Sequence, residues 1–460
     1  MSVLDLTNNI MDAKTGLETY TGGSFKVLIA KVEEQLDIVD FTDEESKQGK
    51  YLIYPTNQGI SPTVNQITAD YVGSPTTDIY PGSTTYAGDL GVGGFPNSNA
   101  FYSSLIWKNK LTKQVEAPIL VITAENSFGL YFTLQAQKVV RLEILTEKAE
   151  GDGYDSRFIE ITEEMKISDL IKKIESYDGF SARLLIGSAD SIVDFSSFVN
   201  NEKLNSDLVF GYNRIAMLEC GTLSDEEKKK YPNYINILKP EEGEPQYFNL
   251  LVYQVKNKLS ASQYYGCQFK SLNFTFANNA LTTINGSVWV VGEKNIKDGT
   301  FYNEREEKRD AIMAQTTNYP TKVFVNGLEA KAISDINVAF EWTKDDIYNV
   351  SMERYNVPNS KYTFTIGGNA MFNKQSEELF YNKLMAGQRL SIVIETNMRW
   401  RNKNYPFIFV CCDVNGQPSK PAISATGNLQ VALNGFQALE GTTQMNSNYL
   451  ITFTDREDLF

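Results

Sequence analysis

The sequence predicts a mainly β fold, with two β domains in tandem and a small α+β module inserted into the first. Three observations support this prediction. Apolar and polar residues alternate with a period of two along many segments. Those segments are rich in Tyr, Phe, Thr and Val, which favour strands. Finally, the order of elements near the start of the chain recurs near its end, which indicates an internal repeat.

The clearest alternation lies in residues 265–295, where two apolar series are separated by Asn278-Asn279. This pattern predicts two antiparallel strands with one buried face and one face of small polar side chains. Residues 335–342 and 390–395 show the same contrast, with acidic residues on the polar side. The polar positions are Ser271, Asn273, Thr275, Asn285, Ser287, Asp335, Asn337, Glu341 and Glu395.

The repeat is predicted from element order. The first copy reads FKVLIAKV (25–32), TTYAGDL (84–90), FYSSLIW (101–107) and VEAPILVITAEN (115–126). The second reads DINVAFEW (335–342), YTFTIGGNAMF (362–372), ELFYNKLMAG (378–387) and GQRLSIVIETN (387–397). Residues 247–257 then correspond to 405–415. Each copy is therefore expected to contain strands and one short helix.

These patterns give the expected domain boundaries. Residues 1–126 with 247–300 form the first β domain, interrupted by a Pro- and Gly-rich loop within 43–98. Residues 127–246 form the inserted module, 301–320 a linker, and 321–460 the second β domain. Inside the insertion, the spacing of Ile167, Leu170 and Ile174 predicts a helix, with Ser168 as its N-cap and Gly179 as its stop.

Composition argues against several functions. The chain has 460 residues, with 43 Lys and Arg against 57 Asp and Glu, and a net charge of −14, which disfavours gripping a DNA duplex through its phosphates. It contains no histidine, so histidine-based catalysis and zinc binding are excluded. The four cysteines lack CxxC spacing and are expected to be buried free thiols.

Membrane and secretory roles are not expected. No apolar run approaches the roughly 20 residues that span a bilayer. The start, MSVLDLTNNIMDAKTG, lacks the basic and apolar segments of a secretory signal, so synthesis in the cytoplasm is expected.

No catalytic arrangement stands out in the sequence. The acidic pairs Asp345-Asp346 and Glu377-Glu378 are adjacent residues that point apart, unlike the paired carboxyl groups of a glycosidase. GDGYD (151–155) lacks the ligand pattern of an EF-hand, and the glycine run 88–94 lacks the Lys-Ser/Thr ending of a phosphate loop. We therefore expect no enzyme activity, no metal and no cofactor.

The paired-strand segments GCQFKSLNFTFANNALTTINGSVWVVG and GNLQVALNGFQALEGTTQMNSNYLITF resemble those of the tail tube (major tail) proteins of long-tailed bacteriophages. TTYAGDLGV with FYSSLIW, and FTIGGNAMF with ELFYNKLMAG, add to the resemblance. It covers most of residues 20–126 and 247–455. It implies β-sandwich or split-barrel domains, each with a flanking helix, joined edge to edge into stacked rings.

The resemblance also implies partners and sites. Two fused domains would make a homotrimeric, pseudo-hexameric ring, or alternatively a homohexamer. The expected partners are a tape measure protein, a tail terminator and viral DNA that passes without specific binding, all within the virion tail. The polar face would line the lumen, with Gln430 and Asn434 added to the positions above. Contacts between rings would come from the long loop, with candidates Tyr71, Pro75, Tyr80, Pro81 and Tyr86.

Two alternative functions remain open. Residues 150–185 faintly resemble part of a contractile tail sheath protein, although the strand pair at 425–455 favours the tube. The frequent aromatic residues would also suit an adhesive β-sandwich that stacks sugars on Tyr and Trp. Rings or tubes would favour assembly, and monomers that retain glycans would favour adhesion.

Overall fold

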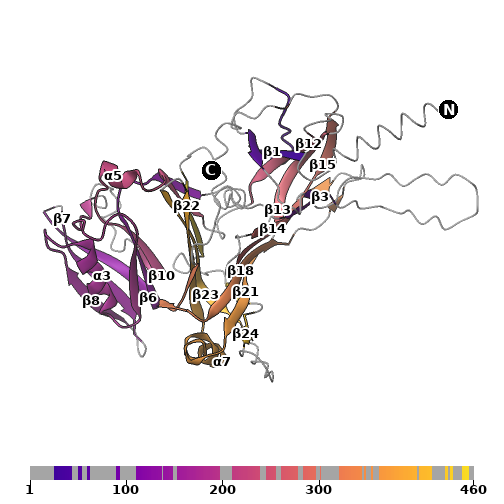
Figure 1. Cartoon of the computed structure of the whole chain (residues 1–460). Helices are drawn as coiled ribbons and strands as arrows, with labels where there is room; N and C mark the ends of the chain where they lie inside the picture. Colours follow the sequence, from indigo (N-terminus) through magenta and orange to yellow (C-terminus); the bar gives the residue numbers. More distant parts are fainter. Residues whose placement is uncertain are drawn as a thin grey trace, which may run out of the picture.

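The computed structural model describes residues 25–43, 50–53, 60–62, 90–93, 110–136, 138–148, 153–196, 210–238, 245–254, 261–277, 283–296, 301, 321–343, 347–348, 354–355, 362–400, 403–416, 430–433, 436–438 and 448–454. They form a mainly β structure (Figure 1) with one continuous sheet of 19 strands and a separate sheet of five strands. The mainly β class predicted from the sequence is confirmed.

The larger sheet combines strands from both ends of the chain. From the first half come β1 (Phe25–Val32), β2 (Lys50–Ile53), β3 (Ile60–Pro62), β4 (Leu90–Gly93), β12 (Tyr247–Gln254), β13 (Ala261–Ala277), β14 (Thr283–Trp289) and β15 (Gly292–Ile296). From the second half come β16 (Lys322–Val325), β17 (Leu328–Glu329), β18 (Ile333–Trp342), β21 (Tyr362–Met371), β22 (Leu390–Trp400), β23 (Lys403–Asn415), β24 (Gln430–Ala432), β25 (Phe436–Ala438) and β26 (Tyr449–Thr454). A separate small hairpin joins β19 (Ile347–Tyr348) to β20 (Arg354–Tyr355).

Among the described residues, the two repeats pair directly with each other at a seam between β13 and β18. Residues Ser271–Ala277 of β13 pair antiparallel with Asp335–Glu341 of β18. Backbone hydrogen bonds therefore run from the first half of the chain into the second without a break in the sheet.

The same pairings recur in each half. In the first half, β3 pairs with β4, β4 with β14, β14 and β15 with β13, β12 with β13, and β1 with β12. In the second, β18 pairs with β21, β21 with β25, β25 and β26 with β23, β22 with β23, and β16 with β22. This order corrects the predicted alignment of the copies. Residues 25–32 match β16 rather than 335–342, and 247–257 match β22 rather than 405–415.

The short helix expected in the second half is present. It is built from α6 (Lys374–Ser376), a π-helical turn η4 (Glu377–Tyr381) and α7 (Asn382–Met385). Asn373 caps it reciprocally with Ser376, which fixes where the helix begins. The helix expected at 101–107 and the linker 302–320 lie outside the described residues.

The insertion begins earlier than predicted. It contains β6 (Ile119–Gln135), β7 (Lys138–Glu147), β8 (Tyr154–Glu160), α3 (Ile167–Glu175), β9 (Phe180–Ile186), β10 (Phe210–Glu219) and α5 (Asp225–Lys228). Because β6 is a single strand that pairs with β7, β9 and β10, residues 119–126 belong to this module and not to the first β domain. The N-cap of α3 is Lys166 rather than the predicted Ser168.

Two strands connect the insertion to the larger sheet. β5 (Lys110–Gln114) pairs with β11 (Tyr234–Leu238), and β11 pairs with β26. Chain segments of the first half thus extend the sheet of the second half.

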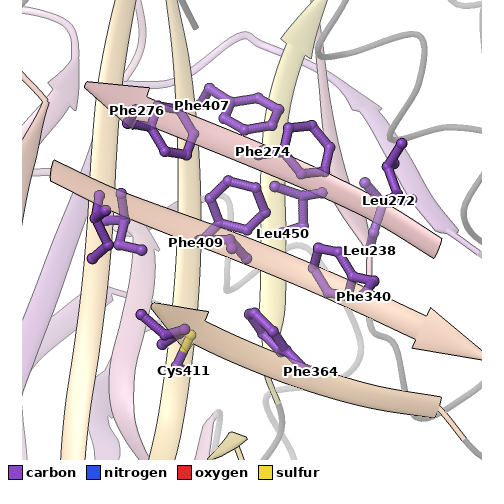
Figure 2. Close-up of a cluster of buried hydrophobic side chains, with 14 of the residues drawn as sticks. Leu238, Leu272, Phe274, Phe276, Phe340, Phe364, Phe407, Phe409, Cys411 and Leu450 are labelled. Atoms are coloured by element: carbon purple, nitrogen blue, oxygen red, sulfur yellow. The ribbon is translucent and has the colours of Figure 1, made fainter. Parts of the chain in front are cut away.

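The core lies between two layers of the larger sheet. β13, β18 and β21 contribute Phe274, Phe340 and Phe364, which face Phe407 and Phe409 of β23 across strands that cross one another (Figure 2). The ring centroids of Phe274 and Phe409 are 5.2 Å apart. Aromatic side chains of this kind contribute large buried areas and defined packing geometry.

The layer formed by β16, β22, β23 and β26 is buried on both faces. Phe407, Phe409 and Cys411 point into the core, whereas Ile408 and Val410 point away from it into a second apolar cluster with the insertion. On the insertion side this cluster contains Ile119, Val121, Leu185, Ile186, Ile215 and Leu223. The core therefore lies between the layer of β13, β18 and β21 and the layer of β16, β22, β23 and β26, which we call the central layer. The insertion packs on the other side of the central layer.

Candidate functional site

The outer face of the sheet formed by β4, β14, β13, β18 and β21 carries small polar side chains in register. Ser271 pairs with Ser287 on one side and with Glu341 on the other. The next row contains Asn285, Asn273, Ala339 and Thr365, and the one beyond it contains Thr275, Asn337 and Gly367. Because paired residues of antiparallel strands share a face, these rows form one surface across the seam.

Local hydrogen bonds hold parts of this surface, which we call the polar face. The hydroxyl oxygens of Ser271 and Ser287 lie 3.1 Å apart, and Ser287 N donates to Ser271 Oγ at 3.1 Å. Asn369 Nδ2 donates to both carboxylate oxygens of Asp335, each at 3.1 Å. Both contacts link neighbouring strands, so the side chains reinforce the backbone pairing.

Gly367 leaves room on the polar face for the side chain of Asn337. A Cβ atom at Gly367 would lie 2.5 Å from Asn337 Oδ1, so the Asn337 side chain occupies the space that a larger residue would fill. β4 supplies Gly91 and Gly93 opposite Ser287 and Asn285. The glycine run therefore provides a strand at the margin of this face.

The side chains in the paired rows of the polar face are either acidic or uncharged. Glu341 is exposed and Asp335 half-buried, while the other paired side chains named above are uncharged. Lys270 occupies the extra position of a bulge between Phe269 and Ser271, outside the paired rows. Along its paired rows the surface therefore offers a phosphate backbone no cation to bind.

The structure brings together eight of the predicted site residues, namely Ser271, Asn273, Thr275, Asn285, Ser287, Asp335, Asn337 and Glu341. Gln430 lies on β24, opposite Met371 of β21. Asn434 and the loop candidates Tyr71, Pro75, Tyr80, Pro81 and Tyr86 lie outside the described residues. The sequence reasoning missed Thr363, Thr365 and Asn369 of β21, although Thr363 and Thr365 alternate visibly with Phe364 and Ile366.

Glu395 does not belong to the polar face, which corrects the prediction. It lies on the central layer and is almost fully buried, forming an ion pair with Arg183 of β9 in the insertion. The guanidinium carbon of Arg183 lies 3.7 Å from the centroid of the Phe324 ring. The polar side of 390–395 therefore faces the insertion and not water.

Two further ion pairs join the insertion to α7 and to β5. Lys383 pairs with Glu125, and Lys113 pairs with Glu219.

The β16–β17 hairpin turns at Asn326 and Gly327, which have φ values of 51° and 81°, as a two-residue hairpin turn requires. Asn326 Oδ1 accepts a hydrogen bond from Ser391 N at 2.9 Å. Burial lowers the pKa of Arg183 to about 10, so its guanidinium stays charged near neutral pH.

Cys220, Cys267 and Cys411 are buried, and none of the three forms a disulfide. Cys220 lies in the core of the insertion, while Cys267 and Cys411 lie in the core between the two layers. Burial raises the pKa of the Cys220 thiol to about 12 and raises that of Cys267 further. These thiols are therefore protonated and unreactive in the folded chain.

Within the described part of the chain, no group of three or more acidic or cysteine side chains could hold a metal ion. None of the helices in the same residues is long and apolar enough to cross a membrane. No model of a protein family and no curated protein matches the sequence.

Proposed function

We propose that this chain is a structural subunit of the tail tube of a long-tailed bacteriophage, with the polar face as the wall of its bore. One observation carries the proposal. The seam between β13 and β18 joins two halves with the same strand pairings, so a single chain already contains one joint between two repeats.

The same joint can be made between chains. Along the polar face the strand order is β3, β4, β14, β13, β18, β21, β25 and β23. By the recurrence of pairings, β3 corresponds to β18 and the end of β23 corresponds to β13. At Asn415, β23 pairs with β25 and with no second strand among the described residues, so this end can pair with β3 of the next chain, which would continue the face and leave no open edge.

Repeated joints of this kind give a closed cylinder. Six repeats require three chains, so we propose a homotrimeric ring, with a homohexamer as the alternative. The polar face then surrounds the passing DNA and gives its phosphates no counterions to displace, so DNA slides through the bore. The insertion lies on the opposite side of the core and would decorate the outside. We also propose that the assembled rings contact a tape measure protein and a tail terminator, and that the chain is located in the virion tail.

Electron microscopy of the purified chain, with its mass measured by sedimentation, tests the proposal. We expect hollow rings or tubes whose smallest unit contains three chains. Monomers at all concentrations would contradict it. Monomers that retain glycans would favour the adhesive alternative, and sleeves that form only around an existing tube would favour the sheath.

A lysine in the bore tests the role of the polar face. Glu341→Lys should leave assembly intact but slow DNA ejection from virions, because each lysine can pair with a phosphate. Glu341→Gln separates loss of negative charge from gain of positive charge. Glu175→Lys, on the exposed side of α3, is the matched control. Ejection at the normal rate with Glu341→Lys would argue against a bore at this face.

The long loop is proposed to hold successive rings together. Because β3 and β4 flank the loop and pair in the sheet, the informative deletion removes only residues 64–88 between them. We expect rings that do not stack. Long tubes from this deletion would show that the loop is dispensable for stacking.

A further inference from the structure

β8 is the outermost strand of the insertion's sheet. Among the described residues it pairs with β7 and with no other strand. Figure 1 places it at the margin of the insertion, away from the larger sheet. An edge strand of this kind presents a row of backbone N–H and C=O groups to which a further strand can add.

Backbone hydrogen bonds show which residues of β8 turn toward this open edge. Ile161 N donates to Val140 O at 2.9 Å, and Lys148 N donates to Gly153 O at 3.2 Å. Residues 153 and 161 therefore face β7. Because the direction alternates along a strand, the even-numbered residues between them face outward. These outward positions are Tyr154, Ser156, Phe158 and Glu160.

The end of α3 covers one part of this edge. Tyr177 Oη donates to Phe158 O at 2.9 Å, and Lys173 Nζ donates to Glu160 O at 3.5 Å. Phe158 O can accept a second hydrogen bond, because a carbonyl oxygen has two lone pairs. Residues 154–156 and Phe158 are exposed. The stretch of β8 that another strand can reach is therefore 154–158.

The sequence of this stretch, YDSRF, is complementary to itself when two copies run antiparallel about Ser156. Tyr154 then lies opposite Phe158 of the partner subunit, and Asp155 lies opposite Arg157 of the partner subunit. Aromatic pairs and opposite charges on facing residues both stabilise antiparallel strands. A pair centred one residue earlier would set two aspartates against each other, and one centred one residue later would oppose two arginines. Charge therefore selects the register centred on Ser156.

The two charged side chains can take part in this contact. Within the described part of the chain, the carboxylate of Asp155 forms no ion pair and no hydrogen bond. The guanidinium carbon of Arg157 lies 5.3 Å and 5.6 Å from the ring centroids of Tyr177 and Phe180, and Arg157 Nη1 donates to Asp178 O at 3.4 Å. These contacts position Arg157 without pairing it with a carboxylate.

We propose that β8 of one chain pairs antiparallel with β8 of a second copy, centred on Ser156, so that two insertions share one continuous sheet. The contact uses the same surface of both copies and closes after two. It goes beyond the proposed tube function and does not depend on it, because the rings use edges of the larger sheet. Pairing of so few residues is weak between free chains and gains strength where several insertions project from one assembly.

A cysteine at the centre of the contact tests the pairing in the full chain. Directly opposed residues of a hydrogen-bonded pair have Cα atoms about 5.5 Å apart, which suits a disulfide. Under mild oxidation, Ser156→Cys should form a dimer linked through residue 156, at least about tenfold faster than Ser196→Cys, an exposed position elsewhere on the insertion. Peptide mass spectrometry identifies the linkage. Equal rates for the two variants would overturn the proposal.

Charge exchange within the Ser156→Cys chain tests the register. Asp155→Arg and Arg157→Asp should each slow the cross-link by about tenfold, because like charges then face each other twice in the dimer. A mixture of these two variants, and one chain carrying both changes, should recover the original rate. An unchanged rate in either single variant, or no recovery in the mixture of folded variants, would overturn the proposal. Asp155→Arg keeps the contacts of Arg157 with Tyr177 and Phe180, so its result counts even if circular dichroism shows that Arg157→Asp unfolds the insertion.

The same experiments separate this contact from the tube. Hollow rings without the cross-link at residue 156 would mean that the β8 contact is wrong while the tube function stands. Cross-linked pairs of chains that form no rings would mean the reverse.

Discussion

The ion pair between Arg183 and Glu395 gives a prediction whose magnitude follows from the structure. The side chains are 20% and 8% exposed, and they join the insertion to the central layer. Glu395→Met leaves a guanidinium that is enclosed by the Phe324 ring and the apolar cluster. We expect a loss of about 3–5 kcal/mol in the free energy of unfolding, because removing one partner leaves a buried charge uncompensated.

The double replacement should behave differently. Arg183 Nη2 is buried without a hydrogen-bond partner in the described residues, so the pair is incompletely satisfied even when intact. Arg183→Met combined with Glu395→Met should therefore lie within about 1 kcal/mol of the original stability. Urea unfolding followed by tryptophan fluorescence and circular dichroism gives the four free energies of the cycle. Additive losses in the double variant would refute the reasoning, because they would mean that the two charges do not interact.

Three other predictions concern the core and the turn beneath the insertion. Gly327→Ala, at a φ of +81°, should cost about 1–2 kcal/mol of stability by urea unfolding, and an unchanged midpoint would exclude strain at this turn. Phe274→Ala should cost about 3–5 kcal/mol, since the ring packs against several others; a loss below about 1 kcal/mol would mean that the core collapses around the gap. Cys220, with its pKa near 12, and Cys267, with a higher one, should resist alkylation at about pH 8 until urea unfolds the chain, as followed by peptide mass spectrometry. Rapid labelling of Cys220 alone would indicate that the insertion opens independently.

The strands of the polar face could be predicted because only one side of them is buried. Ser271, Asn273 and Thr275 alternate with Leu272, Phe274 and Phe276, and the structure places the two sets on opposite faces. Alternation reports burial on one side and carries no information about what covers the other. The pattern in 390–395 looks the same, yet the insertion covers its polar side.

The central layer explains why the prediction that Glu395 lies on the polar face is wrong. Phe407–Cys411 is a continuous apolar run because both faces of β23 are buried, and this signal was present in the sequence. The partner that buries the second face comes from residues 119–223, more than 150 positions away. A single sequence does not indicate which distant segment docks there.

The boundary of the insertion was missed for a related reason. VEAPILVITAEN reads as one strand of the first domain, whereas β6 runs on to Gln135 and pairs with strands of the module. The Asn326-Gly327 pair does predict its turn from the sequence alone, since this dipeptide marks a two-residue hairpin.

The seam between β13 and β18 has a consequence for the order of steps in the assembly that we propose. Its two strands are tethered by the polypeptide itself, so they meet at an effective concentration of about millimolar, whatever the dilution of the subunits. If the proposed ring forms, each newly made chain completes this joint before it encounters a neighbour, and the ring grows by adding repeats already joined in pairs.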